Sequence, residues 1–522
     1  MKKNYLILFF LCLISYVFYI GAELFFTHGH FGVPLDDSWI HFVFARNFAH
    51  EFNLTYNPGE PTAGTTSPLW VIVSGLFSYV SPNFLFNAVF LSAVFHLLSV
   101  FLIYRISLFI FTKKIADFLN HDARLLSTYT PEKLALLTGI LVILTGRFEW
   151  AALSGMETTM FTAISLWGIY ASMKETDENR FTVVPSVIFG LATVSRPEGF
   201  LLFAFYILIT FILLIKENKL SQNILKLFLS LIIFLLISTP YLYFSYKLTG
   251  NFLPNTFRGQ NGGFNFLPNL EYLRISFVLW IRDNAILSIF YLSAFYFYIR
   301  KFRKFFGEFK ILSLLFLWTL GLPVISSVVI PNWRHHVRYQ MPLIPLEVLI
   351  GIICMFWYLS RTAVTKLSSF IRIPKAVTSL LIIVSLAYYM IYAGALGKNT
   401  DNINSQQVYL ANWIKKNIPH DQTIALNDIG AIKFIAGNRV IDMAGLVTPE
   451  ILENRKYNIS DQVDSMYYLL KRNDVRYLII YDDWFKAFLE KYGNKLEFVT
   501  SAILEDNTIC GGVEMKVYRA KW

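Results

Sequence analysis

Long runs of apolar residues in which charged side chains are rare limit the folds open to this chain. Two examples are YLILFFLCLISYVFYIGAELFF (5–26) and LIIFLLISTPYLYFSY (231–246). A helix needs about 20 mostly apolar residues to cross the hydrocarbon core of a bilayer. Charged residues make up 16% of the chain, against about 25% in soluble domains. The sequence therefore predicts a polytopic α-helical membrane protein.

The basic residues are unevenly distributed. Residues 398–522 contain 16 basic and 16 acidic residues, so the whole excess of +11 lies in residues 1–397. There it gathers in short loops such as KK at 113, KENK at 216 and RKFRKFFGEFK at 300. Short basic loops are typical of the cytoplasmic side of membrane proteins, and this distribution argues against nucleic acid as a partner. The three cysteines are scattered and suggest neither a metal site nor a disulfide framework.

With these loops in the cytoplasm, residues 1–397 are expected to form a membrane module of about eleven transmembrane helices. The expected spans are 5–27, 86–111, 134–150, 157–173, 181–195, 199–215, 227–247, 285–299, 311–330, 340–360 and 376–396. The first span runs outward into a long external loop over 28–85. Within that loop, the apolar segment SPLWVIVSGLFSYVSPN is expected to form a helix at the membrane interface.

Residues 398–522 have the pattern of a soluble domain that lies outside the cytoplasm. TIALND, RVIDMAGL and VRYLIIYDD are typical of strands, whereas SQQVYLANWIKKNI, SDQVDSMYYLLKRN and DWFKAFLEKYG are typical of helices. Strands that alternate with helices predict a small layered α/β domain.

The unusual polar motifs all fall on the external side of this topology. They are LDDSWIHFVFARN, SGMET, SRPEG, GNFLPNTFRG and PNWRHHVRYQMPLIP. Such convergence predicts one extracytoplasmic active site at the rim of the helix bundle. The candidate residues are Asp36, Asp37, His41, Arg46, Glu157, Arg196, Glu198, Arg258, Arg334, His335, His336, Arg338 and Tyr339.

Asp36 and Asp37 precede a helical pattern directly after the first span. One of them can cap that helix while the other performs chemistry, because ionisable residues beside a bilayer are costly and usually functional. His41 lies four residues beyond Asp37 and would share its helix face; it either orients the carboxylate or is an interfacial ring. The pair could also hold Mg²⁺ or Mn²⁺, but no motif assigns metal ligands.

The histidine–arginine loop at 334–339 supplies donors that suit an anionic ligand such as a phosphate. Contact with lipid headgroups is the alternative. Arg196 and Glu198 either belong to the site or form an ion pair that closes a turn, and Glu157 suits a helix start. Arg258 lies on an external loop that could fold over a substrate.

LDDSWIHFVFARNFAHEFNLTYNPGEPTAGTTSPLW resembles the first external loop of the GT-C superfamily of glycosyltransferases. The resemblance is greatest to bacterial cell-wall arabinofuranosyltransferases of the terminal β-(1→2) type, which use decaprenyl-phosphoryl-arabinose. It continues through SGMET, SRPEG, LPNTFRG, HHVRYQMPLIPL and LNDIGAIKFIAGNRVIDMAGL, and so covers almost the whole chain.

This resemblance implies a GT-C fold and a catalytic base at the end of the first helix. The base corresponds to Asp36, with Asp37 next because the register of the pair is ambiguous. It further implies a polyprenyl-phosphate sugar as donor, with His335, His336 and Arg338 near its phosphate. The protein would then be a multi-pass protein of the bacterial inner membrane, in contact with membrane lipid.

The residues also suit this chemistry without the resemblance. A base deprotonates the incoming hydroxyl, and arginine and histidine donors stabilise the leaving phosphate. Direct displacement with one base predicts inversion at the anomeric carbon. The acceptor would be a glycan, lipid or protein of the cell envelope. A transporter or flippase of lipid-linked glycans is the main alternative, and a non-catalytic membrane scaffold is the third.

Overall fold

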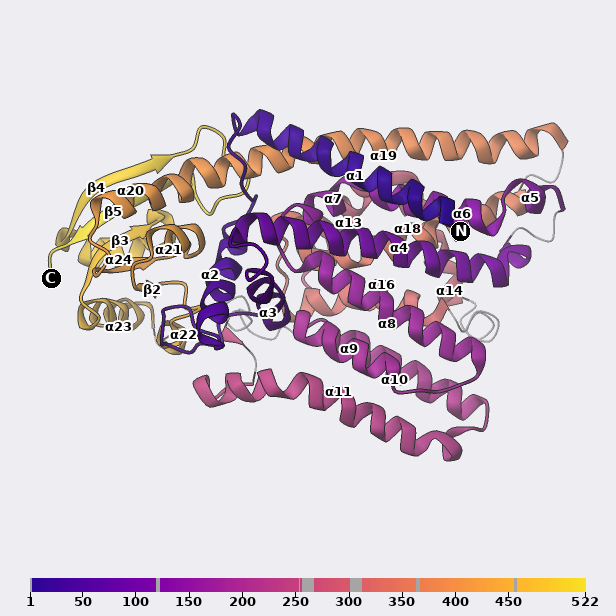
Figure 1. Cartoon of the computed structure of the whole chain (residues 1–522), viewed down its shortest axis with the longest axis horizontal. Coiled ribbons are helices and arrows are strands. Elements are labelled where there is room, and N and C mark those ends of the chain that lie inside the picture. Colours follow the sequence, from indigo (N-terminus) through magenta and orange to yellow (C-terminus); the bar gives the residue numbers. More distant parts are fainter. Residues whose placement is uncertain are drawn as a thin grey trace.

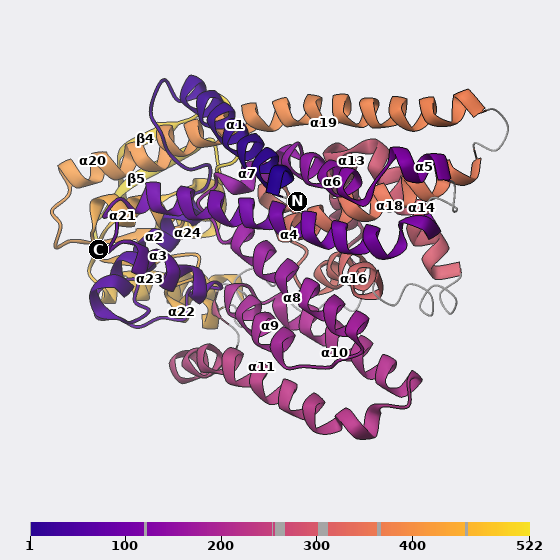
Figure 2. The same cartoon turned by 45° about the vertical axis from the view of Figure 1, so that its right-hand side comes forward.

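The structure is a computed structural model that describes residues 2–118, 123–252, 254–255, 267–300, 312–362, 367–454 and 458–522. A bundle of helices forms most of the molecule, and an α/β domain lies at one end of it (Figure 1). The turned view shows the same two-part arrangement (Figure 2). The C-terminus lies in the α/β domain, whereas the N-terminus lies beside the bundle.

A helix occurs at each position where the sequence predicts a span. These helices are α1 (Lys2–Phe26), α4 (Phe84–Phe118), α6 (Pro131–Ile143), α8 (Thr158–Glu178), α9 (Val184–Ser195), α10 (Gly199–Lys216), α11 (Leu220–Thr249), α14 (Ala285–Arg300), α16 (Ser313–Val329), α18 (Ile344–Thr362) and α19 (Leu367–Ile403). Within the described ranges, six helices are long and apolar enough to cross a membrane, or up to eight if each of two bent pairs is one span. Helices α9 and α16 are apolar but shorter. The chain is a multi-pass membrane protein.

The span predicted at 134–150 is bent rather than straight. Helices α6 and α7 (Gly146–Ala152) meet at 68°. The bend lets α7 pack closely on α19, because a Cβ atom on Gly146 would lie 2.7 Å from the Cβ of Tyr392. Arg147 and Glu149, which follow Gly146, are thereby buried inside the bundle.

The segment before the predicted span at 285–299 also contains a helix that the sequence did not reveal. Helix α13 (Leu270–Asp283) meets α14 at 119°. Asn284 at the junction accepts a hydrogen bond from the Leu287 amide at 3.1 Å and donates one to the Ser385 hydroxyl at 2.6 Å. Polar and charged residues within α13 hide its helical pattern from a search for apolar spans.

The segment predicted to be the first external loop forms two helices, α2 (Asp36–Glu51) and α3 (Pro68–Phe77). Pro68 occupies the first turn of α3, where its missing N–H costs no hydrogen bond. The two helices pack so closely that a Cβ on Gly75 would lie 2.9 Å from the carbonyl oxygen of Ala45. The predicted placement of 67–83 at the membrane interface stays a prediction.

Helix α19 runs through the domain boundary predicted at 397. It continues through η3 (Asn404–Val408), a π-helical turn, into α20 (Tyr409–Asn417). A single helical connection therefore joins the bundle to the α/β domain (Figure 1).

The α/β domain contains a five-stranded sheet in the order β2-β1-β3-β5-β4. Its strands are β1 (Thr423–Leu426), β2 (Val440–Asp442), β3 (Val475–Ile480), β4 (Leu496–Ile503) and β5 (Glu514–Ala520). Its further helices are α21 (Gly430–Ala436), α22 (Pro449–Glu453), α23 (Ile459–Arg472) and α24 (Lys486–Tyr492). Strands β1, β2 and β3 are parallel, whereas β5 and β4 are antiparallel additions to the predicted layered domain. Three successive exposed residues in β4 remove the alternation that marks a half-buried strand.

Candidate active site

The two adjacent aspartates at the start of α2 have different partners. The carboxylate of Asp36 accepts hydrogen bonds from the backbone amides of Gly430, at 2.7 Å, and Ala431, at 2.8 Å. The carboxylate of Asp37 pairs with the Nη2 atom of Arg338 at 2.6 Å. Successive residues of a helix point about 100° apart, so one side chain faces the α/β domain and the other faces the bundle.

Asp37 belongs to a network of charged groups. Its partner Arg338 lies 5.4 Å from the centre of the Tyr339 ring. The Arg196 guanidinium lies 4.7 Å from the same ring and pairs with Glu157 at 3.2 Å. Tyr339 therefore connects two buried guanidinium groups.

His41 and Glu198 complete this network. The Nε2 atom of His41 lies 3.3 Å from Glu157, and Arg196 pairs with Glu198 at 2.6 Å. The structure thus brings together seven of the residues singled out in the sequence. The charge cluster, as we call them, consists of Asp37, His41, Glu157, Arg196, Glu198, Arg338 and Tyr339.

The two aspartates differ in their electrostatic surroundings. Burial, reinforced by the nearby charge of Asp428, raises the pKa of Asp36 to about 8 against the opposing effect of the two amide donors. Burial would raise the pKa of Asp37 too, but Arg338 together with His335 and His41 holds that pKa below its ordinary value. Asp37 therefore carries its negative charge at neutral pH.

The chain reaches Arg338 through an unusual turn. His335, His336 and Val337 have φ angles of 56°, 59° and 53°, all in the left-handed region. Non-glycine residues rarely adopt this conformation, least of all a β-branched valine. Three such residues in succession mark a strained segment that the surrounding structure must hold in place.

A buried ion pair that the sequence analysis missed holds this turn. Arg147 donates to the carbonyl oxygen of His336 at 3.2 Å, and its Nε donates to Asp283 at 3.0 Å. A second, short contact joins Arg147 Nη2 to the other carboxylate oxygen of Asp283. The signal that could have found them is a lone arginine and a lone aspartate beside apolar helices.

Replacing Arg147 by alanine is expected to lower the free energy of unfolding by about 3–5 kcal/mol, because Asp283 would stay buried without its partner. Thermal unfolding of the detergent-purified protein measures the effect. Arg274→Ala is the matched control, since Arg274 pairs with Glu271 on the exposed surface and such pairs contribute about 0–1 kcal/mol. Equal stability of the two variants would contradict a structural role for the Arg147–Asp283 pair.

Other candidates lie outside the charge cluster. The His336 ring packs against Trp150 and Tyr392, with centroid distances of 5.0 and 5.5 Å. Its ring therefore packs against aromatic residues of α7 and α19, and its expected place near the donor phosphate stays a prediction. His335 interacts electrostatically with Asp37 and stays beside the cluster.

Two predicted arginines contact the α/β domain instead. Arg46 donates to the Phe434 carbonyl at 2.9 Å and lies 4.6 Å from the centre of its ring. Arg334 lies 5.5 Å from the Trp484 ring. Arg258 falls outside the described residues.

An apolar pocket of about 180 Å³ adjoins the charge cluster between α10 and α16. Its polar end is formed by Arg196, Glu198 and Tyr339. The rest of its lining is Thr66, Pro197, Phe200, Leu201, Leu322, Ile325, Ser326, Val329 and Ile330. A cavity that is apolar at one end and charged at the other suits a ligand with a lipid chain and an anionic head.

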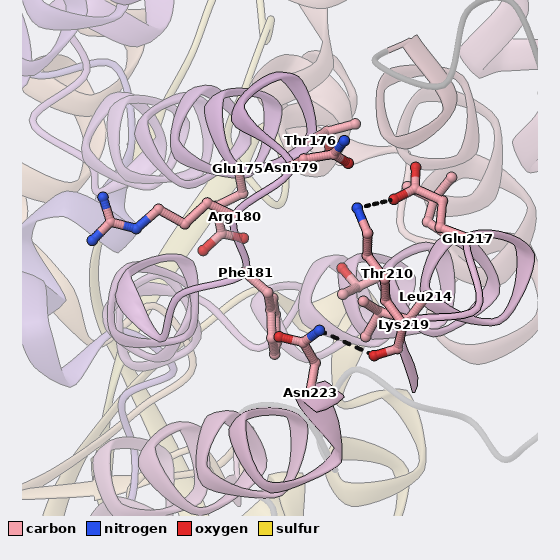
Figure 3. Close-up of a pocket in the computed structure, with 11 residues that line it drawn as sticks. Glu175, Thr176, Asn179, Arg180, Phe181, Thr210, Leu214, Glu217, Lys219 and Asn223 are labelled. Atoms are coloured by element: carbon pink, nitrogen blue, oxygen red, sulfur yellow. Dashed lines mark hydrogen bonds and ion pairs between the residues drawn. The ribbon is translucent and has the colours of Figure 1, made fainter. Parts of the chain in front are cut away.

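A second pocket, of about 60 Å³, lies where α8 and α10 end (Figure 3). Helix α8 begins beside Glu157 and has 21 residues, so this pocket lies about 30 Å from the charge cluster. Two interactions lie within its lining: Lys219 pairs with Glu217 at 3.2 Å, and Asn223 donates to the Lys219 carbonyl at 3.0 Å (Figure 3).

Metal binding at the aspartate pair stays a prediction. Among the described residues, no group of three or more His, Cys, Asp or Glu side chains is arranged to hold a metal ion. Asp36 and Asp37 have separate partners, an amide pair and a guanidinium.

Solved structures of other proteins have a similar architecture. ArnT from Cupriavidus metallidurans bound to undecaprenyl phosphate superposes with a TM-score of 0.58 at 13% identity, covering 98% of this chain and 97% of that one. Its apo state matches equally, at 12% identity. The Archaeoglobus fulgidus oligosaccharyltransferase in the apo form gives a TM-score of 0.56 at 12% identity, with 91% and 69% covered. The fold is that of the GT-C glycosyltransferases.

Comparisons of sequence give less information about the fold than this structural likeness does. Residues 401–518 match a family described as a domain of unknown function, DUF8728. No curated protein matches the chain significantly. The GT-C fold rests on the structural likeness, which at this level of identity concerns the fold and not the sugar.

Proposed function

We propose that this protein transfers a sugar from a polyprenyl-phosphate donor to an acceptor in the cell envelope. The observation that carries the proposal is the charge cluster at the polar end of the apolar pocket. ArnT, which shares the fold, is described as bound to undecaprenyl phosphate. An apolar pocket that adjoins cationic hydrogen-bond donors suits a lipid phosphate.

The first part of the donor's lipid chain enters the pocket between α10 and α16, and the donor phosphate lies against Arg196 and Arg338. The Nε and Nη1 atoms of Arg338 are buried and have no hydrogen-bond partner among the described residues. Buried donors without partners are costly, and guanidinium–phosphate hydrogen bonds are strong. A donor phosphate would satisfy them.

Asp37 is the base in this proposal, although the sequence favoured Asp36. Asp37 is one-third exposed and ionised, whereas both carboxylate oxygens of Asp36 already accept backbone hydrogen bonds. Asp37 takes the proton of the acceptor hydroxyl as the oxygen of that hydroxyl bonds to the anomeric carbon of the sugar. The bond from that carbon to the phosphate oxygen breaks, and polyprenyl phosphate leaves with the electron pair, stabilised by the arginines. Displacement in one step inverts the anomeric configuration.

The charge cluster is proposed to face the extracytoplasmic side of the bacterial inner membrane. Helix α10 follows Glu198 and ends at Lys216, so the basic loops lie at the end away from the cluster. Lys113 pairs with Asp177 at 3.0 Å, near the end of α8 that is far from Glu157. By the positive-inside rule the basic end is cytoplasmic. The α/β domain is then extracytoplasmic, where cell-envelope glycans, lipids and proteins are available as acceptors.

The test is transfer of labelled sugar by the purified protein from synthetic polyprenyl-phosphate sugars, including decaprenyl-phosphoryl-arabinose, to cell-envelope extracts. We expect transfer from at least one lipid-linked donor and none from the matching nucleotide sugars, because these lack the chain that fills the pocket. Arabinofuranose is the sugar that the sequence resemblance favours. If no donor is used and a lipid-linked glycan crosses liposome membranes when the protein is present, the flippase replaces this proposal.

A further inference from the structure

The α/β domain shares a hydrophobic core with the first external loop. Side chains of α20, α21 and the sheet form one buried cluster, and residues of the loop belong to it. Those loop residues are Val43, Phe44, Tyr56 and Val71, each at most 1% exposed. These loop residues thus join the core between the sheet and its helices, and α2 packs against α21.

Reciprocal hydrogen bonds join the same two parts. The Tyr56 hydroxyl donates to the Ile429 carbonyl at 2.7 Å. Asn57 donates to the Val440 carbonyl and accepts from the Val440 amide, both at 3.0 Å. The bond to Ile429 lies directly beside the place where Asp36 binds the amides of Gly430 and Ala431.

The contact at Asp36 leaves no room for a side chain on its partner. A Cβ atom on Gly430 would lie 2.1 Å from the carbonyl oxygen of Asp36 and 2.8 Å from its carboxyl carbon. Backbone atoms can approach this closely only at a glycine. The start of α21 is therefore shaped to the first residue of α2.

Asp36 and Asp37 are consecutive in one helical turn. Any displacement of Asp36 from α21 also moves the backbone of Asp37. The Asp37 carboxylate lies 2.6 Å from the Arg338 guanidinium, so this ion pair would be disturbed. A base displaced by about 1 Å can lose about 10²-fold in rate. The α/β domain thereby controls the geometry of the charge cluster without belonging to it.

We propose that Asp36 is a positioning residue that binds the first amides of α21 and so holds Asp37 against Arg338. The α/β domain then acts as a structural part of the active site rather than as a separate module for binding acceptors. The link to catalysis rests on the proposed function, in which Asp37 is the base. The contact of Asp36 with α21 does not rest on the proposed function.

The experiment is hydrogen–deuterium exchange of the full-length protein in detergent, read by mass spectrometry and combined with the transfer assay. In Asp36→Ala we expect exchange over 429–436 to accelerate about tenfold or more, and kcat to fall while the donor KM changes little. Asp37→Asn should keep the exchange of the unmodified protein and lose transfer. Glu60→Ala is the control, because Glu60 pairs with Arg439 at the exposed rim of the same interface; it should change neither measurement.

Gly430→Ala tests the contact between Asp36 and α21 by a change in the α/β domain that alters no charge. It should accelerate exchange at the start of α2 and reduce kcat as Asp36→Ala does. Unchanged exchange in both Asp36→Ala and Gly430→Ala would overturn the proposal. If Asp36→Ala loses transfer with unchanged exchange, Asp36 is itself the base. Transfer retained by Asp37→Asn would refute the proposed base, while the exchange data would still decide the docking role.

Discussion

Replacement of Asp37 by asparagine is expected to reduce the rate of sugar transfer by about 10²–10⁴-fold, the usual contribution of a general base. Asparagine keeps the size of the side chain and can still contact Arg338, but it cannot accept the proton of the incoming hydroxyl. Single-turnover transfer from a bound lipid donor measures the chemical step. Asp506→Asn is a matched control, because Asp506 pairs with Lys398 on the exposed surface.

The pH dependence of the unmodified protein tests the same assignment. Burial raises the pKa of Asp37, but the charge and hydrogen bond of Arg338 together with His335 and His41 hold that pKa below its ordinary value. An ionised base is lost only when pH falls through that lowered pKa, so the rate should stay level on the acid side until below about pH 4. A transfer rate that titrates near pH 8 would instead indicate Asp36, whose pKa burial raises to about 8.

Replacement of Arg338 by alanine is expected to cost about 10²–10³-fold in transfer, because a preorganised donor to the leaving phosphate is lost. Without the guanidinium, the largest effect that lowers the pKa of Asp37 is lost, so burial raises that pKa. The acid limb of the pH–rate profile should therefore move to higher pH as the rate falls. Arg338→Lys keeps the charge, so it should restore the acid limb more fully than the rate, which depends on the geometry of the guanidinium donors.

Transfer and its pH profile, measured side by side for these variants, distinguish the two roles of Arg338. Arg476→Ala is a suitable control, since Arg476 pairs with Asp474 on the surface of the α/β domain. If Arg338→Ala retained full transfer with an unshifted profile, the charge cluster would not be the phosphate site. The donor would then have to bind elsewhere on the bundle.

The helices of the bundle could be predicted because their signal is local. An apolar run long enough to cross a bilayer must form a helix, since unpaired backbone groups are too costly in lipid. The two bends were not predictable in this way. The bend between α6 and α7 depends on the close packing of Gly146 against Tyr392. The bend between α13 and α14 depends on the hydrogen bond from Asn284 to Ser385.

Most members of the charge cluster were also visible as polar residues beside predicted spans. Their pairing was not, because Asp37 and Arg338 are 301 positions apart in the chain and meet only when the bundle closes. The same holds for Arg147 and Asp283, which no local motif marks. His336 looked equivalent to its neighbour in the sequence, yet the left-handed turn directs its ring to Trp150.

Residue types and their spacing thus define where the membrane helices lie and which polar groups stand at the ends of those helices. Tertiary structure alone distinguishes Asp36 from Asp37. The two residues are chemically identical and adjacent, so no property of the local sequence separates them. The difference arises because one helical step turns Asp36 to the amides of Gly430 and Ala431 and Asp37 to the guanidinium of Arg338.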